Sequence, residues 1–493
     1  MLDGLDDAMS LEAKLKAGMS LVQYQTFFAI GADSEAEMHR REAKLKERMD
    51  SVMQLVHPPG EALRLWQAFF PGKVDGVERS WSIPADPQML ACSGLLGTME
   101  VGDPKGQWFG YEVHNQSPVF VDWFRAMTEL NRTGAVAYVG TLGSGKSIGM
   151  KYSSDCMLQW GAIGVVIDPK KREYYSLIER WRSESVWWQF GAESQLSFTP
   201  FRLADNRAEC KAIAEGWLSV LLNITSRRVD QRASLVIRRA LELLYQGEEW
   251  DMEHYLEALK QERANKGRTK EEQELADLFY ELLAHYEDDA VGRTIFGRDG
   301  EGNELNTNAR LLVVSTTGLD FPDANTSPDA WSESQRFGVA ILYLVAQIGF
   351  RRILDAPSHV MKFYDLDEAW RIRAIPEGRA LINQMILQGR SMNLVLQLGV
   401  QNPDVLLPMP NEANDDLTAN LGWIFVGRLI SKTQIEHAIR LLGLPDDEDY
   451  VTKFQSFENG RGFLRDPQGR IAEIQIEVLP EALLEQFGST PGK

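Results

Sequence analysis

The sequence predicts an α/β fold with a parallel-rich central sheet. Short, continuously apolar segments recur along the chain, helix-forming segments separate them, and a glycine-rich loop joins one strand to a helix. Strands that are apolar throughout are buried on both faces, which is typical of a parallel sheet covered by helices. The 493 residues, of which 44% are hydrophobic and 25% charged, are typical of a soluble globular chain of about three domains.

Six apolar segments account for the expected sheet. They are residues 135–140, 162–168, 310–316, 359–367, 392–399 and 423–429. A strongly apolar helix is expected over 337–354, between two of these strands. Residues 205–295 break the alternation because they are rich in helix formers and contain no proline. We expect them to form an all-helical insertion.

The N-terminal region predicts a partial α+β segment. We expect a short helix over 1–18, a strand over 19–31 and a helix over 60–70. Between them, residues 34–55 predict an amphipathic helix with Ser34 as N-cap and Glu37 completing a capping box. Residues 72–118 are rich in Pro, Gly and Asp and predict a connector with short strands.

These segments divide the chain into four expected parts. They are an N-terminal α+β segment and connector (1–117), a first part of the core (118–204), the helical insertion (205–295), and a second part of the core with a C-terminal tail (296–493).

The charge balance narrows the possible partners. The chain carries 71 Asp and Glu against 52 Lys and Arg, a net charge of −19. Such a field repels phosphate, so an unaided basic nucleic-acid binder is excluded, although a local basic channel is not. Residues 250–290 hold 12 acidic and 5 basic residues, a net charge of −7. This face is either a solvated surface or a docking surface for a basic partner.

Cysteine usage and hydropathy point to an intracellular location. Cys92, Cys156 and Cys210 form no CxxC pair, so we expect buried thiols rather than a disulfide framework or structural zinc. No stretch approaches 18 uncharged apolar residues, and the acidic N-terminus is unlike a signal peptide. We expect a cytoplasmic protein without a transmembrane segment, whose membrane work is peripheral.

The glycine-rich loop matches the phosphate-binding pattern G-x-x-x-x-G-K-[ST]. Its glycines let successive backbone N–H groups point at a phosphate, and the following helix adds its positive end. Lys146 is expected to reach the β- and γ-phosphates, and the Ser147 hydroxyl to ligate Mg²⁺. The predicted nucleotide-binding residues are Gly140, Thr141, Leu142, Gly143, Ser144, Gly145, Lys146, Ser147 and Ile148.

An acidic pair follows the strand at 359–367. Asp367 is expected to hold Mg²⁺, and Glu368 to orient and deprotonate the attacking water. Two alternatives remain: Asp365 as the Mg²⁺ residue, or an exposed helix N-terminus without a catalytic role. The adjacent glutamate favours ATP hydrolysis, and neither the guanine-specifying N-K-x-D nor the ABC-type L-S-G-G-Q occurs.

The pattern DEAW at 367–370, then Gln388-Gly389-Arg390, then a strand leading to Gln401 resembles the additional-strand ATPases of the HerA/FtsK type. Within them, residues 19–480 resemble the TraC (VirB-four) family of type IV secretion and conjugation ATPases. The resemblance implies a RecA-like P-loop core, hexamers with ATP and Mg²⁺ at subunit interfaces, and partners among the channel and coupling proteins at the inner membrane.

The resemblance also implies two further site residues. Gln401 matches the family's sensor glutamine for the γ-phosphate or its water, and Arg390 is placed like a trans-acting arginine finger. Gln401 could instead be an ordinary loop amide, and Arg390 could cap its own helix. Arg428 and Arg461 are rival fingers.

The loop DPKKREY, residues 168–174, leaves further alternatives open. Asp168 is expected to cap the strand end rather than to touch nucleotide. Lys170, Lys171 and Arg172 form either a pore lining or a solvated basic turn.

The sequence therefore predicts an ATP-hydrolysing motor of type IV secretion or conjugative transfer. The alternative is a DNA translocase of the HerA/FtsK or coupling-protein type, and direct DNA binding is not favoured by the charge. A catalytically silent ATP-binding subunit is disfavoured because Lys146, Ser147, Asp367 and Glu368 are all present. The chain is shorter than usual for the family, which leaves docking to the membrane complex in doubt.

Overall fold

The computed structural model describes most of the chain outside its N-terminal part. The described residues are 16, 22–50, 55–57, 60–69, 82–85, 87 and 100–488, without 169, 171, 191–197, 225–227, 288, 290–291, 297–308, 324–325, 409–416 and 446–448. The chain forms two compact units, residues 1–98 and 99–493.

The described residues of the first unit include a small antiparallel ribbon and two helices. Strands β1 (Val22–Tyr24) and β2 (Ile83–Ala85) pair, and they are accompanied by helices α2 (Glu35–Met49) and α3 (Ala62–Trp66). The Ser34 side chain accepts a hydrogen bond from the Glu37 N–H, which confirms the predicted N-cap. The Glu37 carboxylate instead pairs with Arg41. The strand is shorter than predicted, and the predicted helix over 1–18 falls outside the described residues apart from Lys16.

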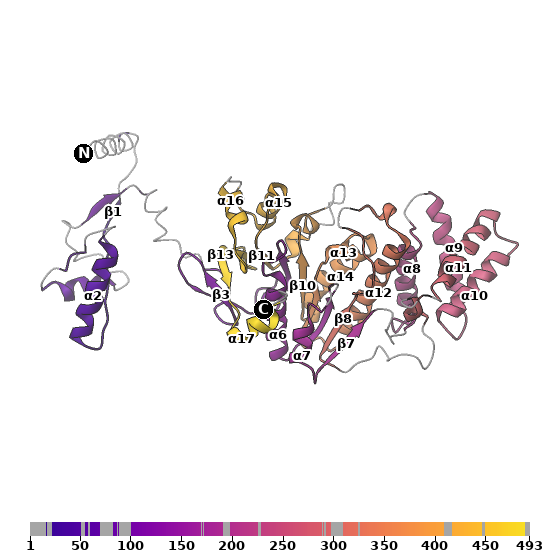
Figure 1. Cartoon of the computed structure of the whole chain (residues 1–493), viewed down its shortest axis with the longest axis horizontal. Coiled ribbons are helices and arrows are strands. Elements are labelled where there is room, and N and C mark those ends of the chain that lie inside the picture. The colour runs from indigo at the N-terminus through magenta and orange to yellow at the C-terminus, as the bar shows by residue number, and fades with distance from the viewer. Residues whose placement is uncertain are drawn as a thin grey trace. The chain divides into compact units, whose positions relative to one another are not determined.

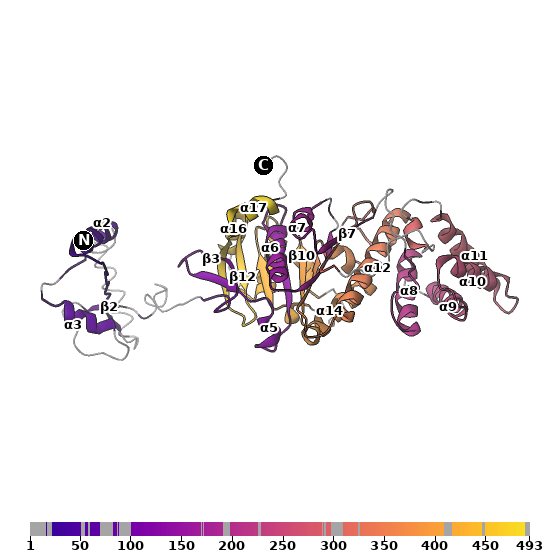
Figure 2. The ribbon, with the colours of Figure 1, turned by 90° about the horizontal axis from the view of Figure 1, so that it is seen from below.

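The second unit is built on one eleven-stranded sheet, seen in Figures 1 and 2, with the order β4-β3-β13-β12-β11-β5-β10-β9-β6-β8-β7. The strands from β11 to β7 in this order run parallel, and those from β12 to β4 are antiparallel. The parallel strands are β5 (Ala135–Val139), β6 (Ile163–Asp168), β7 (Ser185–Gln189), β8 (Leu311–Ser315), β9 (Lys362–Leu366), β10 (Leu394–Val400) and β11 (Trp423–Val426). The antiparallel strands are β3 (Gln107–Glu112), β4 (Pro118–Val121), β12 (Arg461–Arg465) and β13 (Ile471–Ile476).

Helices cover both faces of the sheet, as the apolar strands predicted. Alternate residues of β5 enter two separate cores: Ala135, Ala137 and Val139 join one, and Val136 and Tyr138 the other. On one face lie α6 (Lys146–Gln159), α7 (Tyr175–Arg180) and α17 (Glu481–Phe487), with the short α5 (Arg125–Thr128). The other face carries α12 (Glu333–Asp355) and α14 (Pro376–Met392), with α13 (Trp370–Arg373) between them in the chain. Helices α15 (Lys432–Leu442) and α16 (Asp449–Ser456) complete the unit.

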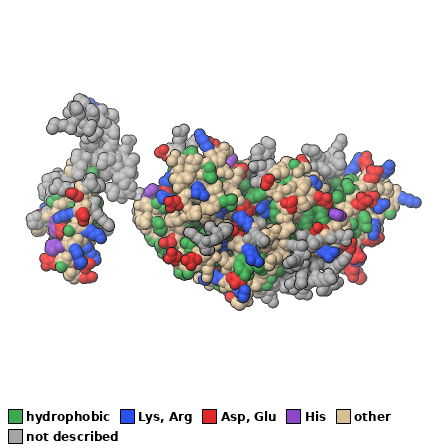
Figure 3. All heavy atoms as spheres, viewed as in Figure 1, with side chains coloured by type: hydrophobic (Ala, Val, Ile, Leu, Met, Phe, Trp, Pro, Cys, Tyr) green, Lys and Arg blue, Asp and Glu red, His purple; other side chains and the backbone are tan. Residues whose placement is uncertain are grey.

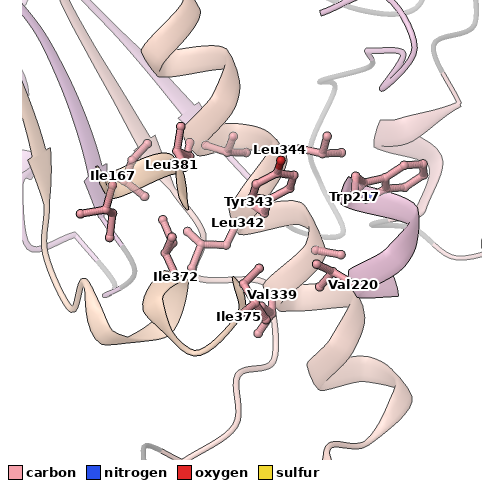
Figure 4. Packing of buried hydrophobic residues seen from close by; sticks show 14 of the residues in the cluster. Ile167, Trp217, Val220, Val339, Leu342, Tyr343, Leu344, Ile372, Ile375 and Leu381 are labelled. Atoms are coloured by element: carbon pink, nitrogen blue, oxygen red, sulfur yellow. The ribbon is translucent and has the colours of Figure 1, made fainter. Parts of the chain in front are cut away.

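Helix α12 is the central core helix on its face. Figure 4 shows its residues Val339 and Leu342 lying between β6 and α13 on one side and α8 (Arg207–Leu221) on the other. Its length and composition would suit a membrane span, but 78% of the apolar window is buried inside the protein. This burial matches a core helix. Cys156 and Cys210 are buried and free, as predicted, and Cys92 lies outside the described residues.

The described part of the predicted insertion consists of helices joined by short loops. After α8 come α9 (Arg228–Leu244), α10 (Met252–Ala264), α11 (Lys270–His285) and a short 3₁₀ turn (Gly292–Ile295). Helix α8 packs on α12, so the insertion shares a core with the sheet. Several acidic side chains pair within the lobe, including Asp277 with Arg263 at 2.5 Å and Glu262 with Arg268 at 2.8 Å. Figure 3 shows acidic and basic groups interspersed over this end of the unit.

All six predicted strands are present, with ends within three residues of the expected ones. Strands β7, β12 and β13 were not predicted, whereas β3 lies within the predicted connector with short strands and β4 begins at its last residue. Strand β3 (107–112) pairs with β13, so the main unit begins before residue 118, the expected start of the core. These residues were predicted to form short strands in a connector, but their mixed Gly, Trp and Glu content did not indicate that one of these strands joins the main sheet.

Candidate active site

The residues of the candidate site lie together because five parallel strands end at the same edge of the sheet. Val139 of β5 is in register with Val400 and Val426, and Leu366 of β9 is in register with Leu398 and Ile167. The carboxyl ends of parallel strands carry their ligand-binding loops on one side. The residues that follow at these ends include Gly140, Gln401, Asp367, Asp168 and Arg428.

The glycine-rich loop curls between β5 and α6, as the motif predicted. Gly145 has a φ of +93°, a conformation that favours glycine, and a Cβ there would lie 2.9 Å from Gly460. The Gly460 N–H donates to the Ser144 carbonyl at 3.2 Å, so the segment before β12 supports the loop. The buried Ser144 hydroxyl has no partner among the described residues. This loop therefore offers backbone and side-chain donors in a tight curve.

Lys146 is the first residue of α6 and its side chain is buried against the loop. Its Nζ donates to the Gly140 carbonyl at 2.7 Å. Burial lowers the pKa of this ammonium, whereas the carboxylates of Asp367 and Glu368 oppose that effect. The lysine is thus held at the loop and faces the acidic end of β9.

The acidic pair lies directly opposite the start of α6. The Ser147 hydroxyl lies 3.5 Å from Asp367 Oδ2, and Asp367 Oδ1 accepts the Glu368 N–H at 3.0 Å. A hydroxyl and a carboxylate are the hard oxygen donors that Mg²⁺ prefers, so this pair fits the ion. Glu368 has a φ of +53°, unusual for a residue other than glycine and typical of functional sites.

Three donors orient the Glu368 carboxylate. Oε1 accepts from Gln401 Nε2 at 2.7 Å and lies 3.1 Å from Lys170 Nζ, and Oε2 accepts from Trp370 Nε1 at 2.8 Å. Burial would raise the pKa of Glu368, but Lys170 and the hydrogen-bond donors outweigh burial and lower it. The carboxylate is therefore held ionised and fixed in direction.

Asp365 does not face the phosphate loop. Its Oδ2 lies 2.5 Å from Ser154 Oγ on α6, and its Oδ1 accepts from Gln397 Nε2 of β10 at 2.8 Å. The Ser154 hydroxyl also donates to the Met150 carbonyl at 2.8 Å and has only one hydrogen, so a protonated Asp365 satisfies all partners. Burial raises the pKa of Asp365 to about 8. The alternative register with Asp365 as the Mg²⁺ residue is therefore wrong, because its neighbours are the polar groups of α6 and β10.

The loop after β6 contributes a residue whose position the sequence did not predict. Lys170 Nζ lies 3.3 Å from Asp367 Oδ2 and 3.1 Å from Glu368 Oε1. It is neither a pore lining nor a solvated turn, whereas Arg172 is exposed and lies over the ring of Tyr175 at 5.6 Å. Lys171 falls outside the described residues. The sequence signal that could have placed Lys170 at the site is its position just after a strand, β6, that could lie beside β9 in the sheet.

Asp168 shapes this loop. Its carboxylate accepts the N–H groups of Lys170 at 2.9 Å and Tyr174 at 3.3 Å, which agrees with the expected capping role. Burial, with the Asp367 charge adding to it, raises the pKa of Asp168 to about 7. The capped turn fixes where Lys170 leaves the backbone.

The three candidate arginines occupy different places. Arg390 is exposed at the end of α14, before β10, and the seven-residue strand puts it about 20 Å from its own phosphate loop. Arg428 lies at the loop itself and donates to the Leu142 carbonyl at 3.3 Å. Arg461 pairs with the buried Glu473 at 2.5 Å. The structure thus brings Arg428 to the site within one chain and leaves Arg390 at the opposite edge of the sheet.

Comparisons with known proteins identify structures with a similar fold. VirB4 of Thermoanaerobacter pseudethanolicus superposes with a TM-score of 0.61 at 16% identity, over 77% of this chain and 99% of that one. The bacterial conjugative coupling protein TrwB, without its first 70 residues, gives 0.51 at 13% identity, over 78% of this chain and 96% of that one. No curated protein matches the sequence.

These likenesses show the RecA-like P-loop ATPase fold that the sequence predicted. The sequence itself matches the family of AAA-like domains over residues 128–487, which span the phosphate loop, the acidic pair and the helical insertion. The chain therefore belongs to the AAA-like domain family.

Proposed function

We propose that the chain is an ATP-hydrolysing motor of a type IV secretion or conjugative transfer system. The observation that carries this proposal is the meeting of Lys146, Ser147, Asp367, Glu368 and Gln401 at one sheet edge. The overall likeness to VirB4 supports the secretion assignment over a generic ATPase.

The proposed chemistry follows from the positions of these side chains. The loop N–H groups and Lys146 bind the phosphates. Glu368 accepts a proton from the attacking water, and Gln401 holds Glu368 and that water in place. When bound between Ser147 and Asp367, Mg²⁺ would neutralise charge developing on the phosphate oxygens. Burial of Asp367 and Glu368 excludes bulk water, which strengthens each of these interactions.

The proposed assembly is a hexamer at the cytoplasmic face of the cell membrane, bound to channel and coupling proteins. In it Arg390 would complete the site of a neighbouring subunit, because it is too far from its own phosphate loop to act there. In this proposal residues 205–295 are a helical lobe inserted into the motor core. The two parts of the core are residues 118–204 and 296–493. The strand β3 extends that core into the expected connector over 1–117.

The second candidate is a DNA translocase of the coupling-protein type. The likeness to TrwB favours it, and the same site chemistry would serve it. ATP hydrolysis by the purified chain, measured with and without double-stranded DNA and alongside its oligomeric state, tests both. A secretion motor hydrolyses ATP at a rate that DNA leaves unchanged. Stimulation by DNA would favour the translocase, and no hydrolysis in any assembled state would contradict both.

A further inference from the structure

The side chain of Lys170 lies within the acidic centre of the site. Its ammonium contacts the two carboxylates that the proposed function assigns to metal and water, at 3.3 Å from Asp367 and 3.1 Å from Glu368. Only 27% of the side chain is exposed. Lys170 therefore brings a cation into contact with both carboxylates.

Lys170 lies on the side of the site toward which the terminal phosphate of a bound nucleotide would point. The glycine-rich loop and Lys146 lie at the end of β5, whereas Lys170 follows β6, three strands along the sheet order β5-β10-β9-β6. A nucleotide bound at the start of α6 extends its terminal phosphate toward the residue that orients the attacking water, here Glu368. With a nucleotide bound, Lys146 from the β5 side and Lys170 from the β6 side would therefore approach the terminal phosphate from two directions.

The local charge requires a second cation. Asp168, Asp367 and Glu368 bring three carboxyl groups to this edge. Among the described Lys and Arg side chains, that of Lys170 pairs with Asp367 and Glu368, whereas Asp168 accepts only the backbone N–H of Lys170. A bound triphosphate would add further negative charge at its end nearest to these carboxyl groups, whereas a bound diphosphate would not reach that far toward the carboxyl groups. A lysine provides a point charge that suits a phosphate oxygen.

We propose that Lys170 is a specificity-determining residue that contacts the terminal phosphate and lets the site distinguish ATP from ADP. The inference rests on the proposed function, because it requires ATP at the glycine-rich loop. The turn capped by Asp168 presents the lysine, and Lys170 can reach the phosphate without leaving the acidic pair, since an ammonium has three donors.

Equilibrium binding of ADP and of the slowly hydrolysed ATPγS, both with Mg²⁺, tests the inference. We expect Lys170→Met to weaken ATPγS binding by about tenfold or more, the loss of one charge-assisted hydrogen bond, and to change ADP binding by less than about threefold. Lys170→Arg keeps the charge and should retain most of the preference. Arg172→Met removes the same charge two residues away and should leave both affinities unchanged.

The variants separate the possible failures. ADP binding by Lys170→Met shows that the site remains folded. Loss of binding of both nucleotides by Lys146→Ala would support the proposed function. If Lys170→Met then binds ATPγS and ADP as wild type does, or loses affinity for both equally, the assignment of Lys170 is overturned and the proposed function stands. If the wild-type chain binds neither nucleotide, the proposed function fails and Lys170 with it.

Discussion

Gln401 donates a hydrogen bond from Nε2 to Oε1 of Glu368 at 2.7 Å, which ties the end of β10 to the end of β9. The two residues are 33 positions apart in the sequence, and they meet because β9 and β10 are parallel neighbours in register. The resemblance to the family implied a role for Gln401 at the phosphate, and this contact gives the role a physical basis. The amide orients the carboxylate that we propose as the base.

Gln401→Ala should slow hydrolysis more than it weakens binding. Loss of the amide frees Glu368 to rotate and removes one donor near the reacting phosphate, so we expect kcat to fall by about tenfold or more with a small change in KM. Gln384→Ala, an exposed glutamine on α14, is the matched control. An unchanged kcat in Gln401→Ala would show that Gln401 is an ordinary loop amide without a role in hydrolysis.

Lys146→Ala should abolish hydrolysis. The ammonium is buried at the loop, and its removal leaves the phosphates without their principal cation. Phosphate release by the purified variant measures the effect, and Lys432→Ala, an exposed lysine on α15, controls for the loss of charge. Turnover at the wild-type rate would rule out the phosphate-loop assignment.

Mixing two inactive variants tests the role of Arg390. Arg390 cannot reach its own loop, so in a mixed hexamer a Lys146→Ala subunit supplies an intact Arg390 to an Arg390→Ala subunit with an intact loop. We expect hydrolysis to reappear in the mixture and in neither variant alone. A mixture of Lys146→Ala with Arg461→Ala should show no such recovery of activity, because Arg461 is paired with Glu473 of its own chain. If no mixing ratio restores activity, Arg390 does not act across the interface.

The buried Asp365 should make stability depend on pH. Its pKa is about 8 in the folded chain and 3.8 in the unfolded one, so the folded state keeps a proton that the unfolded state loses. The stabilisation is complete below pH 3.8 and is lost as the pH rises to about 8. Asp365→Asn mimics the protonated acid, with an amide that donates to Ser154 and accepts from Gln397.

Thermal unfolding at several pH values measures this effect. We expect the Tm of wild type to fall relative to Asp365→Asn by at least a few degrees between pH 5 and pH 8. Asp329→Asn, an exposed aspartate, should track wild type throughout. Parallel curves for wild type and Asp365→Asn would show that Asp365 is already ionised at pH 5.

The sequence predicted the parts of the fold that depend on local pattern. Strands such as β5 and β6 are apolar throughout, and the glycine-rich loop is a contiguous motif, so each is readable without knowing its neighbours. The antiparallel strands β12 and β13 were missed because they carry Arg461 and Glu473, whose ion pair forms only across the sheet. Local pattern cannot reveal such long-range compensation.

The same limit applies to the site. Lys146, Asp367 and Glu368 follow from motifs, whereas the position of Lys170 depends on β6 lying beside β9. That adjacency is a property of strand order, and a Lys-rich loop alone reads as a solvated turn. Asp365 shows the converse, because a carboxylate in an apolar strand predicts either a ligand or a buried polar partner, and only the packing of α6 decides between them.

We propose that Glu368 is the base for ATP hydrolysis at this site. The most direct test compares Glu368→Gln with wild type in two assays on the same preparation, equilibrium ATP binding and single-turnover phosphate release. Glutamine keeps the size of the side chain but cannot accept the proton, so we predict nearly unchanged ATP affinity with hydrolysis slower by about a hundredfold or more. Glu436→Gln, an exposed glutamate on α15, should match wild type in both. Phosphate release by Glu368→Gln at the wild-type rate would show that Glu368 is not the base.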